Sequence, residues 1–185
     1  MRYFTYDDET GEITGAYIQD LHPDHEAGNW IEVTEEQYTQ RHELVVVDGE
    51  LQAKPAPDPA VVLAQQRDQV WERIKAYRER LSDTGGYQVT VGEVTKWFHS
   101  DLKSKTQQIA LVVAGAGVPA VPWKTMDGTF VTMSQPWALA IFAAASAQEA
   151  AIFATAEAHR GAVMASAEPL AYDWTGGWPA VYGGA

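Results

Sequence analysis

The chain has no cysteine among its 185 residues, and it holds only 13 Lys and Arg against 25 Asp and Glu. Without cysteine, a disulfide framework, a thiolate metal site and a cysteine nucleophile are all excluded. The formal net charge of −12 argues against nucleic acid as a partner, because phosphate binding draws on clustered basic side chains. The composition therefore points away from nucleic acid and from cysteine chemistry.

Long runs of Leu, Ile and Val are also absent. The first nine residues turn acidic without an apolar stretch, so we expect no signal peptide and a cytoplasmic location. The most apolar window, 137–155, is mostly alanine and is interrupted by Ser146, Gln148 and Glu149. This window is weaker than a typical spanning segment, so we interpret it as a helix of a soluble protein and predict no membrane partner.

What is present predicts a folded protein of two parts. Hydrophobic residues make up 46% of the chain, and seven are Trp, which is enough apolar material for a core. Prolines at alternate positions in 54–60 favour a stiff extended linker. We therefore predict a β-rich N-terminal module over 1–53, a linker over 54–60, and a main domain over 61–185 with an aromatic C-terminal tail.

In the N-terminal module, alternating residues predict a hairpin of 2–6 with 13–18 and a short strand over 30–33. Thr34 and Gln37 have the spacing of a capping box, which predicts a helix running to about Glu43. Asp48-Gly49 is typical of a type I′ turn in a second hairpin.

The main domain centres on the stretch from 85 to 133, where two hairpins enclose a short helix over 102–114. Long helical patterns flank the stretch over 60–82 and 135–167. The sequence therefore predicts an α+β fold in which the hairpins pack with two long helices and one short one. The alanine-rich helix permits close helix approach within the domain or between subunits, so a homo-oligomer is one of two open alternatives.

No residue cluster predicts catalysis, a metal ion or a cofactor. His22 and His25 match no strong metal-ligand spacing, so an exposed polar loop is the better interpretation. His99, Ser100 and Asp101 include the residue types of a hydrolase triad, but adjacent residues point in different directions, and Ser100 or Asp101 suits a helix cap. We predict a protein that is not an enzyme.

Five aromatic residues are the candidates for partner binding. Trp174, Trp178 and Tyr182 recur every four residues in a segment where Pro179 prevents a regular helix. Large aromatic rings bury much area at little entropy cost, which suits an interface. The alternative is that they cover the domain's own sheet. The other two candidates are Trp97 and Trp123.

The main domain contains motifs that combine aromatic and turn residues in a fixed order: Arg67-Asp68 with Trp71 and Ile74-Lys75, Trp97 to Asp101, Trp123 to Val131, and Ala171 to Pro179. Through these motifs the main domain, over most of 60–185, resembles a domain of unknown function that recurs in small tail-region proteins of tailed bacteriophages and prophages. The N-terminal module, through 30–37 and 45–50, is similar to the start of phage tail fibre assembly proteins.

The resemblance implies a non-enzymatic tail fibre assembly protein, a chaperone that binds the phage tail fibre protein in the host cytoplasm. The alternative is a structural component of the tail or tail fibre that remains in the virion. An unrelated hydrolase or small-ligand-binding domain would need a concave pocket with converging polar groups.

Overall fold

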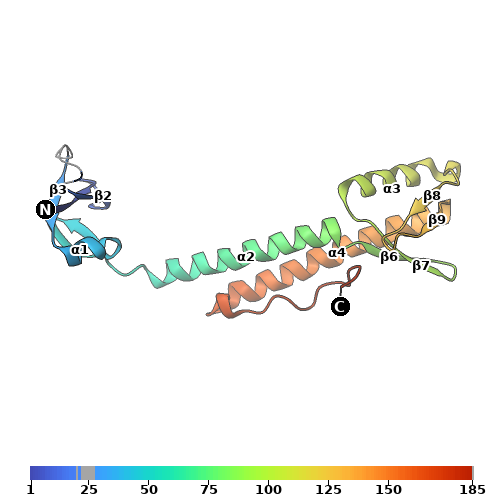
Figure 1. The fold of residues 1–185 in the computed structure, drawn as a ribbon. Helices are drawn as coiled ribbons and strands as arrows, with labels where there is room; N and C mark the ends of the chain where they lie inside the picture. Colours follow the sequence, from blue (N-terminus) through green and yellow to red (C-terminus); the bar gives the residue numbers. More distant parts are fainter. Residues whose placement is uncertain (20, 22–27, 185) are drawn as a thin grey trace. The chain divides into compact units, whose positions relative to one another are not determined.

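The computed structural model describes residues 1–19, 21 and 28–184 and has the α+β fold expected from the sequence (Figure 1). The chain divides into two compact units, Met1–Asp58 and Pro59–Ala185. The division falls inside the predicted linker, which is shorter than predicted at its C-terminal end. Helix α2 begins at Pro59, because a proline at the first helical position gives up an N–H that has no partner there.

Unit 1 contains a three-stranded antiparallel sheet in the order β2-β1-β3 and a separate hairpin of β4 with β5. Phe4 and Tyr3 of the central strand β1 are buried, and the ring of Phe4 stacks on Tyr38 of helix α1. The bounds are β1 Arg2–Tyr6, β2 Ile13–Ile18, β3 Trp30–Val33, α1 Glu35–Thr39, β4 Leu44–Val47 and β5 Glu50–Ala53.

The predicted local signals of unit 1 are present. Both capping-box bonds form: the Thr34 N–H donates to the Gln37 side chain at 2.9 Å, and the Gln37 N–H donates to the Thr34 hydroxyl at 3.2 Å. Helix α1 ends at Thr39, and the 3₁₀ turn η1 Arg41–Glu43 replaces the predicted last turn. Asp48 and Gly49 both have positive φ, as a type I′ turn requires.

Gly11 joins the sheet of unit 1 to its second hairpin. Its carbonyl accepts from the Val46 N–H at 3.0 Å, and its φ is +68°. A Cβ placed on Gly11 would lie 1.9 Å from the Val46 carbonyl oxygen, so only glycine fits this contact.

Unit 2 is built on two long antiparallel helices, α2 Pro59–Thr84 and α4 Gln135–Ala165, which lie side by side (Figure 1). Val70 and Ile74 of α2 pack with Ala156 and Val163 of α4 in one core cluster. All four side chains are nearly or fully buried.

The N-terminal part of α4 belongs to a second core cluster. There Ile141 and Trp137 meet Tyr87 and Phe98 from the hairpin of β6 with β7, and Leu111 from α3. Helix α4 thus runs through both cores and ties the hairpins to α2. The remaining bounds are β6 Tyr87–Val91, β7 Val94–Phe98, α3 Leu102–Ala114, η2 Gly115–Gly117, β8 Pro122–Lys124, β9 Phe130–Thr132 and η3 Pro169–Ala171.

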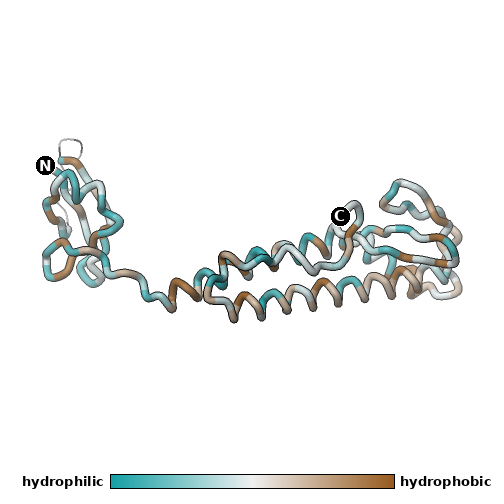
Figure 2. Tube along the Cα trace, turned by 90° about the horizontal axis from the view of Figure 1, so that it is seen from below, coloured by the Kyte–Doolittle hydropathy of each residue, from teal (hydrophilic) through white to brown (hydrophobic). Residues whose placement is uncertain are grey.

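Helix α4 has 31 residues and a window of mean hydropathy 1.5, so by length and composition it could cross a membrane. Only 17% of that window is buried within the part of the chain that the structure describes. Figure 2 shows the contrast in polarity, with α4 mostly in white and brown tones and α2 carrying more teal. Much of the apolar surface of α4 therefore lies outside the two cores.

Candidate functional site

The aromatic tail folds back along α2 and α4 (Figure 1). The rings of Trp174 and Trp178 both contact Tyr77 of α2, with centroid distances of 5.6 and 5.0 Å. The indole N–H of Trp178 donates to the Trp174 carbonyl at 2.9 Å. These rings are half-buried against the α2–α4 core, so they cover the helix pair and not the sheet considered above.

His159 of α4 holds the same tail by both ring nitrogens. Its Nδ1 lies 2.8 Å from the Tyr172 hydroxyl, and its Nε2 lies 3.0 Å from the Gly176 carbonyl oxygen. A carbonyl can only accept, so the neutral ring carries its proton on Nε2 and accepts from Tyr172. His159 lies before the last turn of α4 and anchors the tail.

Tyr182, near the end of the tail, meets the first hairpin of unit 2. Its ring lies 6.1 Å from that of Trp97 on β7, and its backbone N–H donates to the Gly85 carbonyl at 2.9 Å. Trp97 is half-buried, and Tyr182 retains 39% exposure. The fold thus brings two of the five candidate aromatics together on one surface.

Trp123, the fifth candidate, lies on β8 and packs against the core of the hairpins. The turn after it is held by Asp127, whose carboxylate accepts from Thr125, Thr129 and the Lys96 ammonium. The Lys96 hydrogen bond, with those of the threonines, holds the pKa of Asp127 well below its usual value. This network fixes the second hairpin onto the first.

His99, Ser100 and Asp101 do not converge on a common point. The buried Ser100 hydroxyl accepts from the Gly86 N–H at 2.9 Å, and Asp101 is the N-cap of α3, accepting from the Ser104 N–H at 3.0 Å. Hydrogen bonds from the Ser104 hydroxyl and backbone N–H lower the pKa of Asp101. Ser134 is the N-cap residue of α4, and its side chain makes no capping hydrogen bond.

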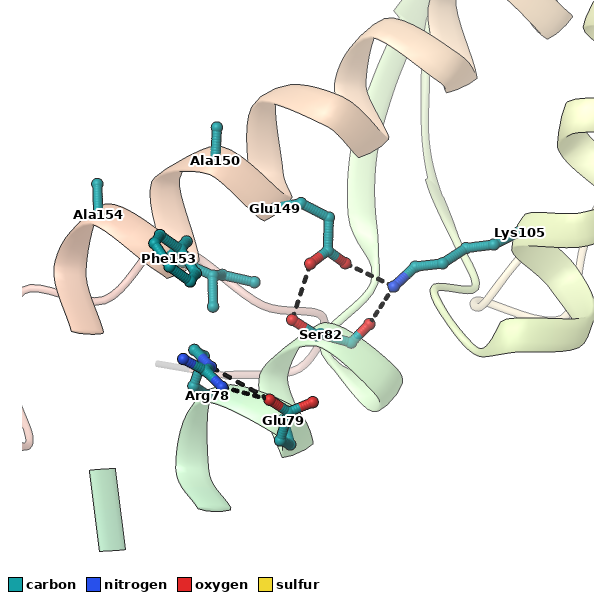
Figure 3. Close-up of a pocket in the computed structure, with 9 residues that line it drawn as sticks. Arg78, Glu79, Ser82, Lys105, Glu149, Ala150, Phe153 and Ala154 are labelled. Atoms are coloured by element: carbon teal, nitrogen blue, oxygen red, sulfur yellow. Dashed lines mark hydrogen bonds and ion pairs between the residues drawn. The ribbon is translucent and has the colours of Figure 1, made fainter. Parts of the chain in front are cut away.

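A polar contact that joins three helices was not predicted. The Lys105 ammonium of α3 donates to Glu149 of α4 at 2.5 Å and to the Ser82 carbonyl of α2 at 2.8 Å. The Ser82 hydroxyl donates to the second Glu149 oxygen at 2.9 Å (Figure 3). Figure 3 also shows Phe153 of α4 lying above Arg78 of α2. Both carboxylate oxygens of Glu149 are engaged, so the arrangement suits cohesion of the helices better than catalysis.

Sequence spacing could not reveal this contact or the His159 anchor, because each joins residues from segments far apart in the chain. One available signal for Glu149 was its isolation, since no other charged residue occurs from 135 to 156. A lone charge in an apolar helix usually has a partner.

No group of three or more potential metal ligands is found among the residues that the structure describes. His22 and His25 lie outside those residues, so the predicted polar loop is not described.

No curated protein and no solved structure matches the chain. A family model matches residues 65–176, which is more than half of the chain and includes most of α2, both hairpins of unit 2, α3, α4 and the first part of the aromatic tail, up to Gly176. The chain therefore belongs to the family described as a domain of unknown function, DUF4376.

Proposed function

We propose that the chain is a phage tail fibre assembly protein, a chaperone that binds the tail fibre protein while the fibre forms. The sequence motifs set out above support this proposal, and the matched family assigns no activity that competes with it. The cytoplasm of the phage's host is the compartment in which such a protein would act.

The observation that carries the proposal is the surface made by Trp97 and Tyr182. The two rings come from β7 and from the tail, lie 6.1 Å apart, and keep part of their area exposed. Paired rings of this kind offer a large apolar contact with few rotatable bonds, which is the composition typical of binding hot spots.

In this proposal, Trp174 and Trp178 contribute to the same surface by holding the tail in place. Their contacts with Tyr77 fix the course of the tail along α2, and the tail then carries Tyr182 to the hairpin. Trp123 stabilises the neighbouring hairpin through its packing against the core. Of the five aromatics, Trp97 and Tyr182 are therefore expected to contribute most to binding.

Co-expression with the neighbouring tail fibre gene tests this function. A chaperone raises the yield of soluble fibre and co-purifies with it, whereas an unchanged yield together with no co-purification would refute the assignment. Phe130→Ala is the control for alanine variants of Trp97 and Tyr182 in this experiment, because Phe130 is an exposed aromatic on β9 outside the proposed surface.

The alternative, a structural component of the tail or fibre, predicts a different distribution of the protein. Mass spectrometry of purified particles separates the two functions. A chaperone is abundant in infected cells and absent or scarce in particles, while a structural component is present in particles in fixed proportion to the other tail proteins.

A further inference from the structure

We propose that two copies of the chain associate through the exposed face of α4, with the two helices antiparallel. The face is defined by the exposed alanines Ala143, Ala147, Ala150 and Ala154, and is hereafter called the alanine face. It is bordered by Phe142 and Phe153, which are 47% and 56% exposed.

The alanine face is unusual for a helix at the surface of a single chain. At 100° per residue, its four alanines fall within about 60° of one another, and the two phenylalanines lie together along one side of them. Glu149 is the only charged residue from 135 to 156, and it is already paired with Lys105. A contiguous exposed apolar surface of this kind marks an interaction site.

The spacing of the face fits a second copy of itself. The alanines follow one another at intervals of four, three and four, which is the same sequence of intervals in either direction. In an antiparallel pair, Ala143 of one copy therefore lies opposite Ala154 of the other, and Ala147 opposite Ala150. Small side chains let helix axes approach to about 8 Å, the short end of the usual range.

The phenylalanines obey the same symmetry. A twofold axis perpendicular to the plane of the two helices keeps the phenylalanines of both copies on the same side of the pair. Phe142 of each copy therefore meets Phe153 of the other. Phe153 already has the Arg78 guanidinium 5.5 Å from the centre of its ring, and the pairing adds Phe142 of the other copy as an apolar neighbour.

The charge distribution does not oppose association with a second copy. Residues 1–58 contain 14 acidic and three basic residues, a net charge of −11, whereas residues 59–185 contain 11 and 10, a net charge of −1. Unit 2 can therefore meet its own copy with little net repulsion despite the −12 of the whole chain.

The surroundings of Glu149 make insertion of α4 into lipid a poorer explanation. Its ion pair with Lys105 and its bond to Ser82 lie at the middle of the helix and join it to α2 and α3. Helix α2 carries charged residues along much of its length, so spanning a bilayer would require the helix pair to separate.

Light scattering on the full-length protein tests the association, with concentrations up to about 200 µM. We expect a mass twice the 20.3 kDa of one chain. Ala150→Glu should return the mass to that of one chain with unchanged circular dichroism, while Ala76→Glu, at an exposed alanine of α2, should leave the dimer intact. The proposal is refuted if the unaltered protein has the mass of a single chain, whether or not it binds lipid vesicles. It is also refuted if the dimer survives Ala150→Glu.

The absence of cysteine allows the orientation to be tested separately. Under mild oxidation, Ala143→Cys mixed with Ala154→Cys should form a mixed disulfide dimer. Ala143→Cys alone should cross-link poorly, because 11 residues place the two thiols of an antiparallel pair about 16 Å apart along the helix. Efficient cross-linking of Ala143→Cys to itself would contradict the antiparallel arrangement.

Discussion

Lys105 and Glu149 form an ion pair of 2.5 Å between α3 and α4, and the same ammonium reaches the Ser82 carbonyl of α2. Both side chains keep partial exposure, 27% and 42%, so the pair is screened by solvent. Its main effect is geometric, because it joins the end of α2, the start of α3 and the middle of α4 at one point.

Replacing either member of this pair should lower stability by a small amount. We expect Lys105→Met to reduce the free energy of unfolding by about 1 kcal/mol, and Glu149→Gln by less, since a glutamine oxygen can still accept from Lys105 or Ser82. Urea unfolding of both single variants and the double variant measures the coupling. A coupling that does not weaken in high salt would contradict an electrostatic origin.

The tail should contribute to the stability of unit 2. Trp178→Ala removes the ring contacts with Tyr77 and His159 and should lower the free energy of unfolding by about 2 kcal/mol, as expected for a half-buried large side chain. Leu170→Ala, an exposed position at the start of the tail, serves as the control. Equal effects of the two changes would show that the tail does not pack on the helices in solution.

The N-cap of α3 gives a prediction about pH. The pKa of Asp101 is lowered in the folded protein by its hydrogen bonds with Ser104, so its carboxylate stabilises the fold fully above the unfolded pKa near 3.8. That contribution is lost as the pH falls through the folded pKa. Asp101→Ala should therefore cost about 1 kcal/mol at pH 7 and progressively less below pH 4, by urea unfolding. A cost that stays constant down to pH 2 would contradict the role of the charged cap.

Two glycines of unit 1 allow the stability cost of backbone strain to be measured apart from the cost of steric overlap. Gly11 and Gly49 both have positive φ, but a Cβ on Gly49 meets no atom within 4 Å, whereas one on Gly11 overlaps the Val46 carbonyl. We expect Gly49→Ala to cost about 1 kcal/mol and Gly11→Ala about 3 kcal/mol or more.

Gly11→Ala also tests whether the units fold separately, as we propose. Under hydrogen exchange, Gly11→Ala should reduce protection only in residues 1–53. Proteolysis of the unaltered protein should cut between 53 and 61 and leave both units folded. Loss of protection throughout residues 61–184 would mean that the two units unfold together.

Local features of this chain were predictable because each depends on a few adjacent residues. The Thr34 capping box, the Asp48-Gly49 turn and the Asp101 cap all follow from side-chain chemistry within four positions. The α+β class was also predictable, from the order of the expected hairpins and helices along the chain.

Contacts between distant segments were not predictable from spacing. Pairing of β3 with β1, the docking of the tail on α2, and the Lys105–Glu149 pair all depend on which surfaces meet in the folded chain. For the same reason, the sequence left open whether the aromatic residues of the tail bind a partner or pack on the domain itself. Trp174 and Trp178 pack on the helix pair, and Tyr182 reaches Trp97, although all three rings share one four-residue spacing.

We propose that the chain binds tail fibre protein through Trp97 and Tyr182. Trp97→Ala and Tyr182→Ala each remove one ring of the exposed pair and leave the Trp178 contacts in place. The most direct measurement is the affinity of the purified chain for the purified fibre protein, compared among the unaltered protein, Trp97→Ala, Tyr182→Ala and the control Phe130→Ala. We expect a loss of about tenfold or more for the first two variants, with unfolding midpoints that keep them folded, and no loss for Phe130→Ala. No measurable affinity of the unaltered protein, or equal affinity of all four proteins, would contradict the claim.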